Sequence, residues 1–262
     1  MKIIILGSGT SQGIPIIGCK CTTCKSANPK DKRLRVSVYI DTGAPKDNNN
    51  GTLKLLIDTS PDFRQQMLAN GLDDIDAILY THHHIDHIMG LDDIRQINQL
   101  HKKTVAVYGN EETVNYLRKA FSYIFDEGTY KGGGLPDIKT NIITLERFKI
   151  NGLEIEPVKY FHGPTEVWGF RIGGFAYLTD CSSIPESAYP KLENLKVLII
   201  DALRFRPHPT HLSIDEAIRE VEKIKPVQAY FVHMTHDVLH DEVNAKLPPG
   251  IQLAYDGLAF EV

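Results

Sequence analysis

The 262-residue sequence lacks several features that would each define a class of protein. No apolar run has membrane-spanning length, and the first one stops at Gly7, which is too short for the core of a secretory signal. Basic residues are not in excess, since the net charge is −4 at pH 7. Binding along an extended nucleic-acid backbone is therefore not expected. We expect a cytoplasmic protein that contacts neither membranes nor long nucleic acids.

Cysteine is also scarce, with four residues in the whole chain. Cys19, Cys21 and Cys24 lie together in GCKCTTC. Cys19 and Cys21 are too close in sequence for easy disulfide pairing, and clustered thiols in a reducing compartment favour metal binding. Zinc in a structural site takes four ligands, and His236 is the candidate for the fourth. His236 follows His233 by three residues, so on a strand the two would face opposite sides and serve different sites. A metal-free, reduced cluster is the alternative.

The remaining composition is that of an ordinary globular protein, with 42% hydrophobic residues, enough for a large core. Short strand-like runs alternate with helical patterns in both halves of the chain. The pattern predicts one α/β domain over residues 1–262, built as two pseudo-equivalent halves with a break near 128–140. Its layers should be α/β/β/α, a four-layer αββα sandwich. The expected strands are 2–7, 35–41, 52–58, 76–81, 104–109, 153–162, a Gly-Gly hairpin over 167–180, 196–202, 228–236 and an Asp-Gly hairpin over 253–262. The expected helices are one carrying Ile88, Leu91, Ile94 and Ile97, one from Glu111, and one from a capping box at Ser213 and Glu216 to Pro226.

The stretch YTHHHIDHIMG, beginning at Tyr80, crowds four histidines and an aspartate just after a predicted buried strand. In an extended segment His82 and His84 share a face, and His83 points the other way. Asp86 and His87 follow where the chain turns into a helix. One loop can thus offer His82 and His84 to one cation, and Asp86 and His87 to a second. Surface or hydrogen-bonded core histidines are the alternative.

Further candidate ligands stand at other predicted strand ends, where ligand sites of α/β proteins collect. They are His162, Asp180, His211 and His233. Each is weak support alone, because a histidine in a loop is usually not a ligand and an aspartate can simply cap a turn. Their shared position strengthens all four. Cys181, next to Asp180, is interpreted as a small buried residue and not as a ligand.

THHHIDH, followed by FHG, LTD and FVH, resembles the metallo-β-lactamase superfamily of dinuclear hydrolases. GTSQGIPIIGCKCTTC, FVHMTH and the terminal YDGLAFEV resemble its PhnP-like branch, phosphodiesterases of the 5-phosphoribosyl 1,2-cyclic phosphate type. The resemblance implies a first metal at His82, His84 and His162, a second at Asp86, His87 and His233, and Asp180 bridging both. It implies Mn or Zn there, a structural zinc at the cysteines, and a non-ligand His211 near the substrate.

The expected reaction is hydrolysis of a small cyclic or nucleotide-like phosphodiester by a metal-activated hydroxide, with Asp86 and His211 in the catalytic site. His211 would act either as the general acid or as a phosphate ligand. The alternatives are a tRNA 3′-end endonuclease, a thioester hydrolase and an oxygen-reducing di-iron protein. Arg204 and Arg206 are interpreted as phosphate-binding or simply solvated. The expected partners are the substrate and, as one option for assembly, a second copy of the chain in a homodimer.

Overall fold

The computed structural model describes residues 1–262 except 47–50, 127 and 129–133. The described part contains two seven-stranded sheets, in the orders β14-β1-β2-β3-β4-β5-β6 and β13-β12-β11-β10-β9-β8-β7. The strands of the first sheet are β1 (Lys2–Gly7), β2 (Ser37–Pro45), β3 (Thr52–Ile57), β4 (Ala77–Leu79), β5 (Val105–Gly109), β6 (Ile138–Ile142) and β14 (Ala259–Glu261). Those of the second are β7 (Phe148–Ile150), β8 (Leu153–His162), β9 (Thr165–Ile172), β10 (Phe175–Leu178), β11 (Val197–Asp201), β12 (Gln228–Val232) and β13 (Ile251–Leu253).

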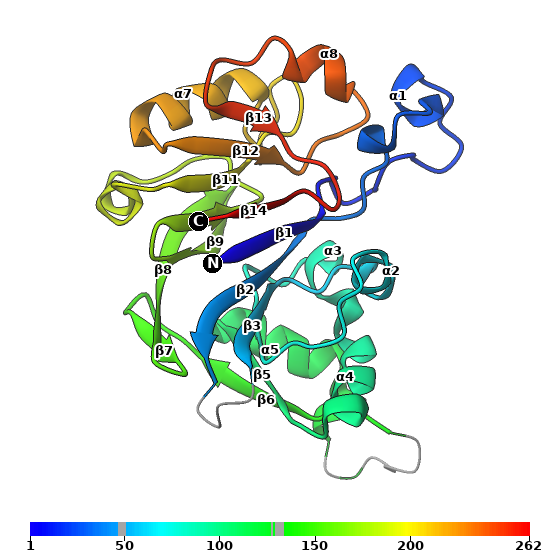
Figure 1. Ribbon diagram of the computed structural model, residues 1–262, viewed down its shortest axis with the longest axis vertical. Helices are drawn as coiled ribbons and strands as arrows, with labels where there is room; N and C mark the ends of the chain where they lie inside the picture. The colour runs from blue at the N-terminus through cyan, green and yellow to red at the C-terminus, as the bar shows by residue number, and fades with distance from the viewer. Residues whose placement is uncertain (47–50, 127, 129–133) are drawn as a thin grey trace.

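Helices cover the outer face of each sheet (Figure 1). They are α1 (Thr22–Lys25), α2 (Phe63–Ala69), α3 (Ile85–Ile88), α4 (Ile94–His101), α5 (Glu111–Ala120), α6 (Ser122–Phe125), α7 (Ile214–Ile224) and α8 (His240–Asn244), with 3₁₀ turns at Pro29–Asp31, Met89–Asp93 and Glu186–Leu192. One buried cluster joins α2–α5 to the first sheet. A second fills the space between the two sheets. A third joins α7 to the second sheet. These three cores confirm the predicted four-layer architecture.

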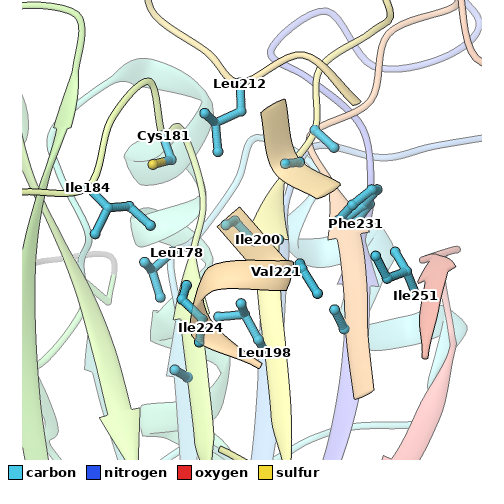
Figure 2. Packing of buried hydrophobic residues seen from close by; sticks show 14 of the residues in the cluster. Leu178, Cys181, Ile184, Leu198, Ile200, Leu212, Val221, Ile224, Phe231 and Ile251 are labelled. Carbon is cyan, nitrogen blue, oxygen red and sulfur yellow. The ribbon is translucent and has the colours of Figure 1, made fainter. Parts of the chain in front are cut away.

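The core beneath α7 shows how sequence pattern becomes packing (Figure 2). Ser213 and Glu216 form the predicted capping box at the start of the helix. The helix then buries Ile214, Ala217, Val221 and Ile224 at helical spacing. Leu198, Ile200 and Phe231 of the continuous apolar strands β11 and β12 meet this face.

Two sequence predictions of local structure were wrong. The helix expected through Ile88 and Ile97 is three segments, α3, the 3₁₀ turn Met89–Asp93 and α4, although all four of its apolar residues are buried as predicted. The Asp-Gly hairpin at the C-terminus is absent, because β13 pairs with β12 and β14 pairs with β1 in the other sheet. Asp256 instead turns its carboxylate inward, where it accepts hydrogen bonds from Ser8 and Leu34.

Other predictions match the described chain. The strand pair joined by Gly173 and Gly174 is the antiparallel hairpin of β9 and β10, and α5 begins at Glu111. The predicted break at 128–140 lies largely outside the described residues. Among the described residues, no helix combines the length and the apolarity needed to cross a bilayer.

The topology gathers strand ends at one edge of the molecule. β3, β4 and β5 run parallel, as do β10, β11 and β12. Their carboxyl ends therefore meet at the same side, where a ligand site is expected in α/β folds. Asp58, Thr81, Asp180, Asp201 and His233 all lie at or just beyond these ends.

Candidate metal centre

Two groups of ligand-type side chains meet at this edge and share Asp180. His82 and His84 form one group with Asp180, and Asp86, His87 and His233 form the other. Within each group the candidate ligand atoms lie within 4.8 Å of one another. The Asp180 Oδ1 atom is 3.2 Å from His87 Nε2, and its Oδ2 atom is 3.3 Å from His233 Nε2 and 4.0 Å from His82 Nε2. One carboxylate thus faces both groups.

His162 and His211 lie beside these groups. The His162 ring is 5.2 Å from the His84 ring and 5.9 Å from the His82 ring, centroid to centroid. Its ligand atoms group with Asp180 and His211, however, and not with the other two histidines. The His211 ring stacks on His233 at 4.6 Å. The structure therefore brings all eight predicted side chains of the centre to one place.

Three of the residues at the centre have left-handed backbone conformations, which non-glycine residues seldom adopt. They are Asp58, Asp180 and His233, with φ of 61°, 54° and 63°. Asp58 and His233 directly follow β3 and β12, and Asp180 lies two residues after β10, so each stands where its strand ends. Such conformations cost about 1–3 kcal/mol and persist where the surroundings enforce them, often at functional sites.

Hydrogen bonds fix which nitrogen each imidazole turns toward the centre. The His162 Nδ1 atom donates to the carbonyl of Thr210 at 2.6 Å, because a carbonyl only accepts. The His87 Nδ1 atom donates to the Asp58 carboxylate at 2.8 Å. The Thr81 hydroxyl donates to Asp58, so it accepts from His82 Nδ1 at 3.0 Å. In each ring the Nε2 atom is left to face the centre.

Several of these inward-facing nitrogens are buried without a partner. Nε2 of His82, His87 and His233 has no hydrogen-bond partner, although buried polar atoms are nearly always satisfied. Imidazole nitrogens and carboxylates are ligands for Zn²⁺, Mn²⁺ and iron. Orphaned nitrogens of this kind, converging on a shared carboxylate, are what a pair of cations would satisfy, so the donor set fits divalent metal.

The two groups differ in protonation. Burial is the largest effect in lowering the pKa of His82, His84 and His162, so these rings are neutral and ready to coordinate. Burial also opposes charge on His87 and His233, but Asp180 and the other nearby carboxylates outweigh it. They raise the pKa of His87 well above its usual value and that of His233 to about 9. Burial likewise opposes ionisation of Asp86, and the adjacent His87 and His233 outweigh it to lower the Asp86 pKa.

Two supporting carboxylates escaped the sequence reasoning. Asp58 is fully buried and, through His87 and Thr81, positions one ligand of each group. Asp201 is fully buried too; its Oδ2 atom accepts from His211 Nδ1 at 3.1 Å, and its Oδ1 atom is 3.7 Å from His233 Nδ1. Asp58 ends the run LLID and Asp201 ends the run LIID. Their position at the end of an apolar strand-like run was the only sign in the sequence that they could belong to the site.

The remaining residues singled out in the sequence have structural roles. The His83 ring packs against the Tyr116 ring at 4.7 Å, away from the centre. Cys181 is buried in the apolar cluster beneath α7 beside Leu178 and Ile184 (Figure 2). Burial raises its thiol pKa well above the usual value, which does not suit a metal ligand.

The glycine-rich turn after β1 packs closely against neighbouring backbone and has a structural role. A Cβ atom on Gly7 would lie 1.9 Å from the Arg35 carbonyl oxygen, so only glycine fits. The backbone N–H groups of Ser8, Gly9 and Thr10 donate to Asp256, Leu34 and Met234 inside the protein. They are therefore already engaged and do not form a phosphate cradle.

The cysteine cluster closes around His236. The His236 Nδ1 atom lies 3.2, 3.6 and 3.7 Å from the sulfurs of Cys19, Cys21 and Cys24. A tetrahedral zinc with Zn–S of about 2.3 Å and Zn–N of about 2.0 Å separates such atoms by about 3.6 Å. The donor set and its spacing fit zinc. His236 reaches this cluster because the chain leaves β12 at Val232 and reverses at His233, and not because of strand alternation as predicted.

This fold and this pair of ligand groups define a metal-dependent hydrolase. The family model described as "Beta-lactamase superfamily domain" matches residues 54–234. A crystal structure of a new diphosphatase from the PhnP family is 43% identical, with a TM-score of 0.89, over 100% of this chain and 97% of that one. The chain therefore belongs to the metallo-β-lactamase superfamily, in its PhnP-like branch, as predicted from its motifs.

Curated relatives are longer than this chain. The octanoyltransferase of Porphyromonas gingivalis (strain ATCC BAA-308 / W83) is 39% identical over 261 residues, which cover 98% of this chain and 51% of that protein. Coenzyme PQQ synthesis protein B of Methylorubrum extorquens (strain PA1) is 35% identical over 105 residues, 37% of this chain and 34% of that protein. The chain thus spans about half of the first and matches a third of the second. The human tRNase Z short form, 15% identical with a TM-score of 0.68 over 100% of this chain and 99% of that one, shares the fold.

Proposed function

We propose that the protein is a phosphodiesterase that hydrolyses a small cyclic or nucleotide-like phosphodiester at a dinuclear metal centre. The observation that carries the proposal is the Asp180 carboxylate, which faces two converging groups of histidine and aspartate side chains. The 43% identity to a PhnP-family diphosphatase supports phosphoryl chemistry over other reactions of the superfamily.

In this proposal His82, His84 and His162 hold the first cation. Asp86, His87 and His233 would hold the second, and Asp180, which faces both groups, would contribute to holding both cations. Manganese or zinc suits this ligand set. Two such cations would supply a nucleophile by lowering the pKa of water, and would offset the charge that develops on phosphoryl oxygens.

The chain's own residues orient this chemistry. Asp58 holds the His87 ring and, through Thr81, the His82 ring, which leaves both Nε2 atoms facing the centre, where they would hold the cations. Asp201 accepts the Nδ1 proton of His211, so the His211 Nε2 atom is available to the substrate. In the protonated form, the His211 ring could give its Nε2 proton to the leaving alkoxide as the P–O bond breaks.

The proposal is tested by loading purified protein with Mn²⁺ or Zn²⁺, measuring metal content, and assaying hydrolysis. The panel contains bis-p-nitrophenyl phosphate, 2′,3′-cyclic nucleotides, a precursor tRNA and an octanoyl thioester. We expect turnover of the first two classes. Preferential cleavage of the precursor tRNA would favour the endonuclease alternative, and preferential cleavage of the thioester would favour the thioester hydrolase.

The His211→Ala variant is expected to lose turnover of a 2′,3′-cyclic nucleotide by about 10²- to 10⁴-fold, because its alkoxide leaving group needs a proton. Bis-p-nitrophenyl phosphate, whose leaving group is stable as an anion, should lose far less. Steady-state kinetics on the two substrates gives the comparison. Equal losses on both would assign His211 to phosphate binding instead of proton transfer.

The cysteine cluster is proposed as a structural zinc site. The Cys24→Ala variant should lose one zinc per chain, measured by mass spectrometry of the metal. Its thermal midpoint should fall by at least about 5 °C, since each kcal/mol is worth about 2–4 °C at this size. Cys181→Ala is the matched control, as it removes a buried thiol outside the cluster. The site is disproved if both variants retain the same zinc content as the unmodified protein.

A further inference from the structure

Arg33 is a buried cation with no part in the chemistry proposed above. Its side chain is fully buried, and its Nη2 atom lies 3.4 Å from the equally buried Asp31 carboxylate. Burying a guanidinium is costly unless a counter-charge and hydrogen-bond acceptors compensate for the lost water. The partners of its other N–H groups therefore indicate what this side chain does.

The Arg33 guanidinium donates to two main-chain carbonyls, one on each side of His236. Its Nη1 atom donates to the Thr235 carbonyl at 3.2 Å, and its Nη2 atom donates to the Val238 carbonyl at 2.7 Å. These carbonyls bracket the turn that carries His236, whose Nδ1 atom faces the three cysteine sulfurs. A planar guanidinium presents its donors in fixed directions, so it fixes the separation of the two carbonyls, which a single ammonium nitrogen cannot do.

The backbone of Arg33 is joined to the loop that carries the cysteines. The Arg33 N–H donates to the Ile14 carbonyl at 2.8 Å, and the Ile14 N–H donates to the Arg33 carbonyl at 2.7 Å. Two residues further along this loop, the Ile16 N–H donates to the Cys24 sulfur at 3.4 Å. The loop, with α1 on it, stands out from the two sheets (Figure 1). One residue therefore connects the cysteine loop to the turn of His236.

Met234 joins the turn over 235–238 to His233 of the dinuclear centre. The Met234 N–H donates to the Ser8 carbonyl at 3.1 Å, and the Met234 carbonyl accepts from the Thr10 N–H at 3.2 Å. His233 belongs to the second group of candidate ligands and not to the group of His82 and His84. Because so few residues intervene, a displacement of the turn is transmitted to His233. The cysteine cluster and the second cation thus depend on one short segment.

We propose that Arg33 is a positioning residue that holds His236 beside the cysteines and, through the same segment, holds His233 at the second cation. The inference rests on the zinc site and the dinuclear centre proposed above. It makes the metal affinity of both sites depend on one buried side chain that touches neither metal. The histidines proposed for the first cation lie outside this segment, so the affinity for that cation is independent of Arg33.

The test measures metal affinity at each site in Arg33→Met, which removes the guanidinium and keeps an apolar chain. Co²⁺ stands in for zinc, because its charge-transfer absorption with thiolates reports the cysteine cluster alone. Mn²⁺, which disfavours thiolates, reports the dinuclear centre by calorimetric titration. We expect Arg33→Met to weaken Co²⁺ binding at the cysteines by roughly 10- to 100-fold, as loss of an outer-shell contact does. The second Mn²⁺ should weaken by a smaller factor, at least about threefold, and the first should not change.

Arg33→Lys is the conservative variant. It keeps the positive charge opposite Asp31 but offers one nitrogen in place of the guanidinium fork. We expect it to recover part of the Co²⁺ affinity and of the affinity for the second Mn²⁺. It also carries the same comparison if Arg33→Met does not fold, which circular dichroism shows.

Hydrogen exchange of the metal-free protein reads the positioning without any metal. The backbone N–H groups of Met234, Thr235 and Val238 are all hydrogen-bonded, to Ser8, Leu203 and Thr235. Arg33→Met should speed their exchange, because it removes the donors that bracket the turn.

Arg171→Met is the matched control. The Arg171 guanidinium also donates to two main-chain carbonyls, those of Gly173 and Lys191, at 2.9 and 2.8 Å. It lies toward the end of β9 opposite the end that pairs with His162. This variant should leave both metal affinities and the exchange of the 233–238 segment unchanged.

The proposal is overturned if Arg33→Met binds both metals as tightly as the unmodified protein, or weakens them no more than Arg171→Met does. It is also overturned if the first Mn²⁺ weakens as much as the second, which a general loss of stability would produce. An unmodified protein without the Co²⁺–thiolate absorption would disprove the zinc site, and with it the role of Arg33 there. None of these measurements requires turnover, so a failure of the proposed phosphodiesterase activity is recognised separately.

Discussion

Replacing Asp180 by asparagine is expected to lower phosphodiester turnover by at least about 10³-fold, which corresponds to about 4 kcal/mol of transition-state stabilisation. The reason is the shared position of this carboxylate. It lies within 3.2–4.0 Å of His87, His233 and His82, and each of these belongs to one of the two ligand groups. Removing its charge should lower the affinity of the centre for both cations and remove the ligand that the two groups share. Asparagine adopts left-handed backbone readily, so the conformation at φ 54° is retained.

Metal content and turnover are measured together for this variant. We expect fewer than two cations bound per chain at the centre, while the zinc proposed for the cysteine cluster remains. Asp256→Asn serves as the control, because Asp256 is a nearly buried carboxylate that contacts only structural donors at Ser8 and Leu34. This control should lose stability but keep its metal. A fully loaded and active Asp180→Asn protein would disprove the bridging assignment.

Metal loading of the two groups is expected to respond very differently to pH. At pH 7, before a cation binds, His87 and His233 hold protons that the surrounding carboxylates stabilise, with the His233 pKa at about 9. A cation must displace these protons, so its affinity falls as the pH falls through this range. Two competing protons give a decrease of up to about 100-fold per pH unit. His82, His84 and His162 have lowered pKa values, so the affinity of this group for its cation should change little between pH 8 and pH 7.

Calorimetric titration with Mn²⁺ in buffers of different ionisation enthalpy measures the protons released at each step. We expect a first cation that binds with little proton release and a second that releases close to two protons at pH 7. His233→Asn should reduce the release at the second step by about one proton. Equal proton release at both steps would contradict the asymmetry between the groups.

The layers and the clustering of ligand residues were readable from sequence because they depend on local patterns. Strand-like runs ending in His162, Asp180 or His233 placed these residues at one sheet edge, and adjacency along the chain placed His82 to His87 there as well. The grouping of Cys19, Cys21 and Cys24 with His236 likewise followed from residue types. In each case the side chain's chemistry and its distance from a strand end carried the information.

What sequence did not reveal depends on contacts between distant segments. Asp58 and Asp201 each end an ordinary apolar strand, and only the tertiary structure shows that they orient His87 and His211. The C-terminal YDG turn has the local signature of a hairpin, yet edge pairing of β14 with β1 and the buried bonds of Asp256 outweigh that preference. The helix expected through Ile88 and Ile97 is interrupted by the 3₁₀ turn Met89–Asp93, in which Gly90 lies against Ser60 and Phe63 so closely that a Cβ atom would meet the Ser60 carbonyl at 2.3 Å.

The left-handed residues Asp58 and Asp180 also constrain how this lineage can change. At such positions the left-handed backbone suits asparagine as well as aspartate, and a single nucleotide substitution interconverts their codons. A gene duplicate could therefore lose the proposed hydrolytic chemistry through one substitution at Asp180 while keeping the backbone conformation of the site.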